Sequence, residues 1–110
     1  GRMLEDIVLL EVRKTAPSTM EAFKFKFDAG GEFDMVIYDK TNQNCRIYEI
    51  KHSTEANEKQ TLHLRDAEKC QIVEKRFGPI SGKFVLYRGK DTFAEGVQYL
   101  NVENFLCGLK

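Results

Sequence analysis

The sequence contains no tryptophan, only two prolines and no cysteine pair spaced as CxxC. Its three cysteines, Cys45, Cys70 and Cys107, are odd in number and widely separated, so they do not indicate a disulfide framework. No apolar run approaches the roughly 20 residues of a membrane span, and the N-terminus has no signal-peptide pattern. These absences predict structural thiols in a reduced, cytoplasmic setting and no membrane partner.

An excess of charge of either sign is also missing, because 17 basic residues balance 17 acidic ones. A free-standing nucleic-acid-binding domain more often carries a basic excess, with a pI above roughly 9. The balance therefore counts against tight nucleic-acid binding by the isolated chain, although it is compatible with a local basic patch.

The length of 110 residues predicts a single domain over residues 1–110, since such a chain can bury one core but not two. Gly1, which precedes Arg2 and Met3, is interpreted as the remnant of an expression tag. A helical pattern follows almost immediately. We therefore expect the chain to be part of a longer protein.

The apolar spacing predicts the order helix, three strands, helix, strand, strand, helix. Residues 3–14 are too rich in apolar side chains for a one-sided surface helix, so we predict a largely buried one. Residues 20–28 alternate, with Phe23, Phe25 and Phe27 on one face, which is typical of a half-buried strand. The other predicted elements are strands at residues 33–38, 46–51, 83–87 and 96–101, a long helix at 58–77 capped by Ser53 or Thr54, and a terminal helix at 102–109.

This order predicts an α/β fold in which helices flank a mixed central sheet. Short turns make the first three strands an antiparallel meander, and the long helix crosses to the fourth strand. Gly78 and Pro79 end that helix, as a C-cap glycine and a proline that cannot continue it. Acidic and basic side chains are mixed along the helix, which favours a solvated surface over a nucleic-acid-binding stripe.

The most unusual stretch is the predicted hairpin of residues 32–52, because its strand ends are charged. Asp34 begins the first strand, and Glu49 and Lys51 close the second on one face, with Ile50 on the other. Unpaired charges are costly to bury, and the hairpin places Asp34 beside Glu49, where two carboxylates repel unless a cation or proton intervenes. Mg²⁺ fits this pair, because it prefers oxygen ligands and usually takes one or two protein carboxylates.

Lys51 adds a group that suits phosphodiester hydrolysis. From the face of Glu49 it can orient a water or stabilise the charge that develops on a phosphate, and a metal ion would activate the water. The triplet E-x-K is common on protein surfaces and is weak evidence alone. Its place on the second strand of a hairpin, after a helix that carries Glu5, makes it stronger.

These motifs resemble the PD-(D/E)xK superfamily of restriction-endonuclease-like nucleases, whose core runs αβββαβ. The matching residues are Asp34 and the triplet Glu49, Ile50 and Lys51, while Phe33 stands where the superfamily name has proline. Within the superfamily, the chain is most similar to the C-terminal domain of unknown function attached to prokaryotic AAA+-type ATPases. The similarity covers roughly residues 4–87 and rests on the segments LEDIVLLEV, EFDMVIYD and YEIKHS.

The resemblance implies a fold, a site and partners. It implies an α/β, restriction-endonuclease-like αβββαβ core, with Asp34, Glu49 and Lys51 as catalytic residues. Asp34, Glu49 and the backbone carbonyl of Ile50 would bind Mg²⁺ or Mn²⁺, and Glu5 would be the helix acid beside the site. The implied partners are DNA and an upstream ATPase module, and self-association is left open.

Glu11 and Gln60 are supporting candidates only. Glu11 shares a helix face with apolar residues, but most single glutamates on helices are solvated. Gln60 begins the second predicted helix, where several nucleases of the superfamily place a glutamine, and a surface role is at least as common. His52 and His63 have no partner at a metal-binding spacing such as HxxxH, so we expect structural or solvated roles.

Three functional interpretations stay open at this point. The first is a Mg²⁺-dependent endonuclease or exonuclease that cuts DNA rather than RNA, as the C-terminal module of an ATPase. The second is a non-catalytic nucleic-acid-binding, regulatory or interaction module that retains the scaffold, which the balanced charge favours. The third is an interaction domain in which Lys51 forms a buried ion pair with Asp34 or Glu49.

Overall fold

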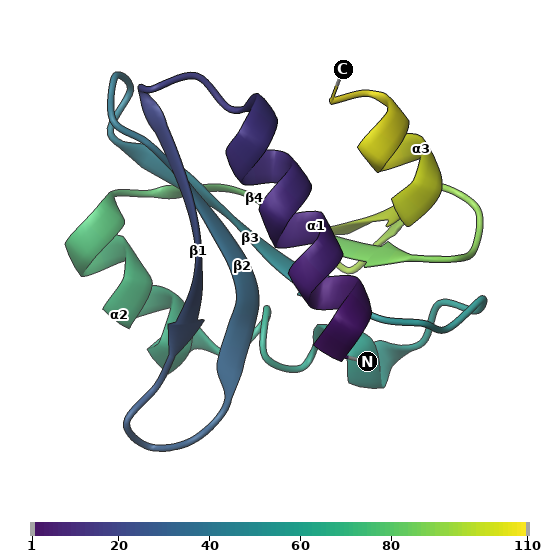
Figure 1. The fold of residues 1–110 in the computed structure, drawn as a ribbon. Helices are drawn as coiled ribbons and strands as arrows, with labels where there is room; N and C mark the ends of the chain where they lie inside the picture. Colours follow the sequence, from purple (N-terminus) through teal and green to yellow (C-terminus); the bar gives the residue numbers. More distant parts are fainter. Residues whose placement is uncertain (1, 110) are drawn as a thin grey trace.

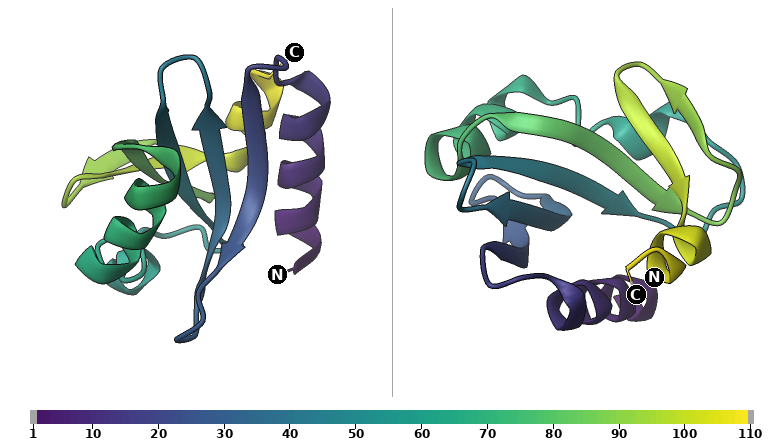
Figure 2. Two further views of the ribbon diagram at one scale, coloured as in Figure 1. Left: turned by 90° about the vertical axis from the view of Figure 1, so that its left-hand side faces the viewer. Right: turned by 90° about the horizontal axis from the view of Figure 1, so that it is seen from above.

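The protein has three layers, a central sheet with helices on both faces (Figures 1 and 2). The computed structural model describes residues 2–109. Helices α1 and α3 lie on one face of the sheet and α2 on the other, as the view from above in Figure 2 shows. The elements are α1 (Arg2–Thr15), β1 (Met20–Lys26), β2 (Glu32–Asp39), β3 (Asn44–Ile50), a 3₁₀ helix η1 (Glu58–Thr61), α2 (Ala67–Phe77), β4 (Ile80–Tyr87), β5 (Thr92–Ala94), β6 (Val97–Asn101) and α3 (Val102–Cys107).

The six strands form one mixed sheet in the order β1-β2-β3-β4-β6-β5. Strands β1, β2 and β3 are antiparallel neighbours, as the short turns predict. Helix α2 then crosses over the sheet, so that β4 pairs in parallel with β3, and β6 pairs in parallel with β4. The predicted α/β class and the predicted αβββαβ order are both confirmed.

The sheet face under α2 is covered by one apolar cluster. Phe23, Phe25 and Phe27 all belong to it, so the alternation in the first strand predicts their common face correctly. The rings of Phe23 and Phe77 pack with centroids 4.9 Å apart, which joins the edge strand β1 to the end of α2. Burial of such large rings is the main favourable contribution to this layer.

Helix α1 covers the opposite face, together with α3, but it is not largely buried as the sequence predicts. Leu4, Val8 and Val12 pack into the second apolar cluster at helical spacing. Leu9 packs partly against the same cluster, but Met3, Ile7 and Leu10 face outward and are 76%, 45% and 53% exposed. The prediction fails because apolar density does not reveal that only one side of this helix has a sheet to cover.

The predicted long helix over residues 58–77 is broken, and this prediction is wrong in its first half. Helix α2 begins at Ala67, because the Asp66 side chain caps it by accepting the N–H groups of Glu68 and Lys69. Leu64 follows the helical spacing but lies in a turn, from which its side chain enters the core. Ser53 does not cap a helix either, since its hydroxyl bonds to the backbone of Glu55 in a local turn.

The C-terminal elements agree with the sequence except at one edge of the sheet. Strand β6 and helix α3 lie within the predicted ranges, and Asn101 caps α3 by accepting the N–H of Asn104. Strand β5 is missing from the prediction, since its residues are all exposed and show no apolar alternation. Within residues 2–109, no helix is long and apolar enough to cross a membrane.

Gly78 closes α2 with a positive φ of 83°, as the predicted C-cap requires. It also lies directly against the β2–β3 turn, so that a Cβ placed there would be 1.9 Å from the carbonyl oxygen of Gln43. Gly30, in the β1–β2 turn, has a φ of 105°, but a Cβ there would meet nothing within 4 Å. Substitution of Gly30 would therefore introduce backbone strain alone, whereas substitution of Gly78 would introduce both backbone strain and a steric clash.

We expect Gly78→Ala to destabilise the fold more than Gly30→Ala does. Left-handed backbone strain costs about 1–2 kcal/mol and applies to both variants, but only Gly78→Ala adds a collision with backbone, which we expect to cost at least about 2 kcal/mol more. Urea midpoints of the two variants measure the difference. Equal midpoints would show that α2 and the hairpin turn separate easily.

Candidate metal centre

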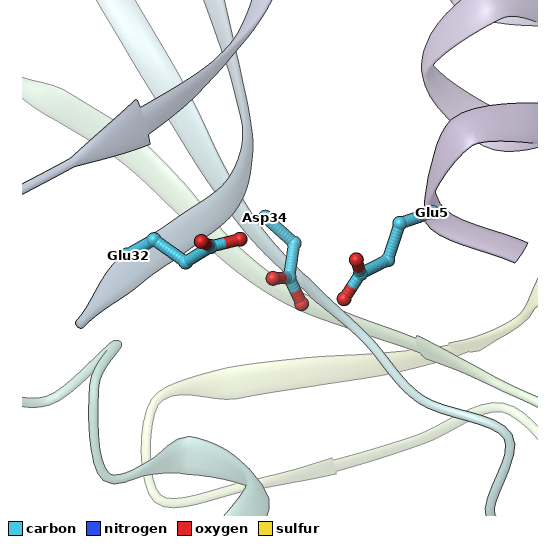
Figure 3. Close-up of side chains that lie close together, drawn as sticks. All are labelled: Glu5, Glu32 and Asp34. Carbon is cyan, nitrogen blue, oxygen red and sulfur yellow. The ribbon is translucent and has the colours of Figure 1, made fainter. Parts of the chain in front are cut away.

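The candidate residues meet at one edge of the sheet, the site edge, which consists of the start of β2 and the ends of β3, β4 and β6. These ends coincide because β2 is antiparallel to β3, while β3, β4 and β6 are parallel. The first turn of α1 brings Glu5 to the same place (Figure 3). An acid in the first turn of a helix is favoured by the positive end of the helix dipole.

Asp34 lies at an irregularity in the ladder between β1 and β2. Phe25 pairs with Phe33, and the next recorded pair is Phe23 with Val36, so β2 advances three residues where β1 advances two. The extra residue makes a bulge beside Asp34. Bulges interrupt the strict alternation of a strand and re-aim side chains, and here the Asp34 side chain is directed toward Glu5 on α1 (Figure 3).

The carboxylate of Asp34 is buried and is fixed by the neighbouring strand. Its Oδ2 accepts the backbone N–H of Ile50 at 2.8 Å. The β2–β3 ladder pairs Met35 with Tyr48, and one further step along both strands reaches Asp34 and Glu49. The register agrees with the expectation that the hairpin places these two acids on neighbouring positions.

Three carboxylates converge at this point: those of Glu5, Glu32 and Asp34, whose oxygens all lie within 4.8 Å of one another. Figure 3 shows the three side chains pointing toward a common region from α1 and β2. Glu49 lies outside this tight group, on the adjacent strand β3. The prediction from the sequence therefore includes Asp34 and Glu5 but not Glu32.

Glu49 is 2% exposed, and its two oxygens have different surroundings. Oε2 lies 3.5 Å from the ammonium of Lys51, a side chain that is 45% exposed. Oε1 is fully buried and has no hydrogen-bond donor among the described residues. A buried carboxylate oxygen without a donor is unfavourable by itself, so the site favours a cation or a proton at this position.

A family model for a domain of unknown function, DUF4143, matches residues 1–105. The chain belongs to the DUF4143 family. No curated protein and no solved structure matches it at a significant level. The family description assigns no activity, so the function of this DUF4143 domain has to be argued from the carboxylates themselves.

Both buried carboxyls of the DUF4143 domain hold their protons unusually strongly. The pKa of Asp34 is raised from 3.8 to about 7, chiefly by burial and also by the charge of Glu5, against the lowering effect of the Ile50 N–H. Burial also raises the pKa of Glu49 from 4.5 to about 8, and the charge of Asp34 adds to the rise, while Lys51 lowers it. Desolvation and mutual repulsion are therefore the two costs of ionising this pair.

The charges at the site fit a divalent cation. Four carboxylates, those of Glu5, Glu32, Asp34 and Glu49, are accompanied by two ammonium groups, Lys24 on Glu32 at 3.7 Å and Lys51 on Glu49 at 3.5 Å. When every group is ionised, four negative and two positive charges give the site a net charge of −2. The donors are all carboxylate oxygens, the ligand type that Mg²⁺ and Mn²⁺ prefer.

Glu32 is the residue that the sequence analysis overlooks. It stands two residues before Asp34 in the same strand, and residues at that spacing share a face in a regular strand. The motif EFD therefore contains a signal for Glu32. The motif of Asp34, Glu49 and Lys51 has only one acid on the first strand and does not include it. Its ion pair with Lys24 at 3.7 Å leaves it half-buried beside the cluster.

The weaker candidates lie elsewhere. Glu11 is on the surface of α1, 3.6 Å from the ammonium of Lys14, and does not join the cluster. Gln60 is in η1, and its side chain lies outside the described part of the structure. His63 is in the turn before α2, not within a helix, and its Nδ1 lies 3.1 Å from the Lys69 ammonium. Ile50 is buried under α1, and the role of its carbonyl stays a prediction.

We expect the metal-free domain to lose stability as the pH rises from about 4 to about 8. The carboxyls ionise near 3.8 and 4.5 when unfolded but near 7 and 8 when folded, so the folded state binds more protons in this window. Stability is therefore complete below the unfolded pKa values and is lost as the pH rises through the folded ones. In a chelating buffer, Tm should fall by more than about 5 °C between pH 5 and pH 8.

Glu49→Gln should flatten this profile and be neutral or stabilising at pH 8, because it removes one of the two repelling charges. Glu11→Gln is the matched control, since that carboxyl lies on the surface, and it should keep the wild-type slope. A clear loss of Tm in Glu49→Gln at pH 8 would contradict the idea of repelling, desolvated carboxylates.

Proposed function

We propose that this DUF4143 domain is a Mg²⁺- or Mn²⁺-dependent nuclease module of the PD-(D/E)xK type that hydrolyses phosphodiester bonds in DNA. The observation that carries the proposal is the buried Glu49 Oε1, which has no donor among the described residues and lies on the strand beside Asp34. The αβββαβ order and the acid–x–lysine triplet at the end of β3 support the same assignment.

Asp34, Glu49 and the carbonyl of Ile50 would hold the cation, with Glu5 and Glu32 beside them. When bound, a divalent cation supplies Lewis acidity and lowers the pKa of water. The protein prepares the site by fixing Asp34 Oδ2 on the Ile50 N–H at 2.8 Å, so that the carboxylate does not have to reorganise. The bulge in β2 and the first turn of α1 hold the other carboxylates close to it.

Lys51 would act on the phosphate. In hydrolysis, the oxygen of water forms a bond to phosphorus while an ester P–O bond breaks, and the departing oxygen takes up a proton. Negative charge on the phosphate oxygens has to be stabilised during this exchange. The Lys51 ammonium is half-exposed and 3.5 Å from Glu49 Oε2, so it can donate to a phosphate oxygen without leaving the site.

A non-catalytic module that keeps the nuclease scaffold is the second candidate. Two observations favour it: the formal charge of the chain is zero, and Lys51 already pairs with Glu49. The ion pair of the third interpretation is present but only half buried, because the Lys51 side chain is 45% exposed while Glu49 is enclosed. An exposed lysine contributes little to stability through such a pair, which leaves it available for another role.

The wider setting is also proposed. The three cysteines are unpaired, two of them buried, which supports a reducing, cytoplasmic compartment. The similarity of the sequence to the C-terminal domains of AAA+-type ATPases supports an upstream ATPase module as partner. In that setting, the ATPase would bring the domain to its DNA, which compensates for the absence of an overall basic charge.

We expect purified protein to cleave plasmid DNA with Mg²⁺ or Mn²⁺ and not in EDTA. Asp34→Asn and Lys51→Ala should each lower the rate by at least about 100-fold, because each removes a group aimed at the developing charge. Lys75→Ala, an exposed lysine of α2, is the control and should leave the rate unchanged. Cleavage that survives both Lys51→Ala and Glu49→Ala would indicate contamination, and absence of cleavage with no Mn²⁺ binding would favour the non-catalytic module.

Glu32→Gln tests the carboxylate that the sequence analysis overlooks. If Glu32 supports the cation, the variant should bind Mn²⁺ about 10–100-fold more weakly by isothermal titration. Glu21→Gln is the control, because that glutamate also pairs with a lysine from β1, through Lys40 at 2.8 Å, but is far from the cluster in the sheet. Unchanged affinity in Glu32→Gln would mean that Glu32 serves only its pair with Lys24.

A further inference from the structure

The site edge continues beyond the carboxylates into a loop after β4. Strands β3 and β4 are parallel and end together, since Ile50 pairs with Leu86. The segments that follow them lie side by side, with the N–H of Arg88 donating to the Ser53 carbonyl at 2.9 Å. The contact is close: a Cβ on Gly89 would be 2.5 Å from the Thr54 carbonyl oxygen.

Asn101, at the end of β6, holds this loop in a defined shape. Its Nδ2 donates to the carbonyls of Gly89 at 2.9 Å and Arg88 at 3.3 Å. Its backbone N–H donates to Asp91 Oδ1 at 2.7 Å, and the Tyr87 hydroxyl donates to the Lys90 carbonyl. The loop's carbonyls and its single acid are therefore engaged by the protein, while the side chains of Arg88 and Lys90 are exposed.

These two cations have no acidic partner within salt-bridge distance among the side chains that the structure describes. They line a hollow of about 590 Å³ to which Thr54, Thr92 and Asn104 add hydrogen-bonding side chains. The exposed His52 follows Lys51 along the same edge. Asp91 is the acid among the lining residues, and its Oδ1 accepts the Asn101 N–H. Arginine, lysine, threonine and asparagine are the side chains that commonly contact phosphates of nucleic acids.

We propose that Arg88 and Lys90 bind the phosphates of a nucleic-acid strand whose scissile phosphate lies at the carboxylates; this rests on the proposed nuclease function. Neighbouring strands lie about 4.8 Å apart, so the distance from β2 across β3 to β4 is about 10 Å. A nucleic-acid strand carries one charge per roughly 3.4 Å of helix axis. A distance of about 10 Å exceeds one such interval, so the carboxylates and the loop cations would contact different phosphates of one strand, and the substrate is an oligonucleotide or polymer, not a mononucleotide.

The experiment compares two double variants that change the formal charge equally, from 0 to −2. Arg88→Ala/Lys90→Ala removes the loop cations, and Lys14→Ala/Lys75→Ala removes two exposed lysines of α1 and α2. Anisotropy of labelled single-stranded and duplex DNA, with Ca²⁺ in place of Mg²⁺, gives Kd at several salt concentrations. The loop variant should lose at least tenfold in affinity, and its slope of log K against log[salt] should fall by about 1.4 on single strands and 1.8 on duplex.

Hydrolysis assays separate this proposal from the nuclease proposal. On a small diester, bis(p-nitrophenyl) phosphate, the loop variant should match wild type, whereas on DNA its KM should rise with little change in kcat. If wild type hydrolyses neither substrate, the nuclease proposal fails, and the binding assay alone decides the loop. Equal Kd and salt slope in the two double variants would overturn the phosphate track, as would an absence of DNA binding by wild type. Displacement of DNA by poly-glutamate at equal charge concentration would also overturn it, in favour of an acidic protein partner.

Discussion

The arrangement of this domain depends on the burial of two carboxylates, Asp34 and Glu49, at the end of one hairpin. Each is almost fully removed from water, and they stand on adjacent strands, so ionisation of both is opposed by desolvation and by repulsion. Among the described residues, the Ile50 N–H and the Lys51 ammonium oppose these costs. A fold that keeps such a pair has a deficit of positive charge at one defined place, and this deficit is the basis of the proposed divalent-cation site.

The topology of the sheet brings side chains from several elements to that place. The antiparallel meander brings the start of β2 to the end of β3, and the crossover through α2 brings the parallel ends of β4 and β6 to the same edge. Acids then come from β2, β3 and α1, and cations from the segments after β3 and β4. Neutral overall charge thus conceals a separation of charge along the site edge, with carboxylates at one end and Arg88 and Lys90 toward the other.

The chain belongs to the DUF4143 family, but the description of that family states no activity. The proposed chemistry rests on three local features. They are the bulge beside Asp34, the enclosed Oε1 of Glu49 and the half-exposed ammonium of Lys51. A structural ion pair alone would account for one oxygen of Glu49 but not for the other. This combination is the reason why we propose a site for a cation and a phosphate and not only a pair that stabilises the fold.

The sequence by itself determines the α/β class, the order of the elements apart from η1 and β5, and the hairpin that carries Asp34, Glu49 and Lys51, because strand alternation and turn residues are local signals. It fails where a tertiary contact decides. The Asp66 side chain accepts N–H groups in the first turn of α2, so the helix begins at Ala67 and not at residue 58. The outer side of α1 is exposed because it faces away from the sheet. Glu32 shares the face of Asp34 through strand spacing, but only the folded chain brings the first turn of α1, with Glu5, to the same place. Which charges meet at the site edge is set by strand order, and strand order is a property of the folded sheet.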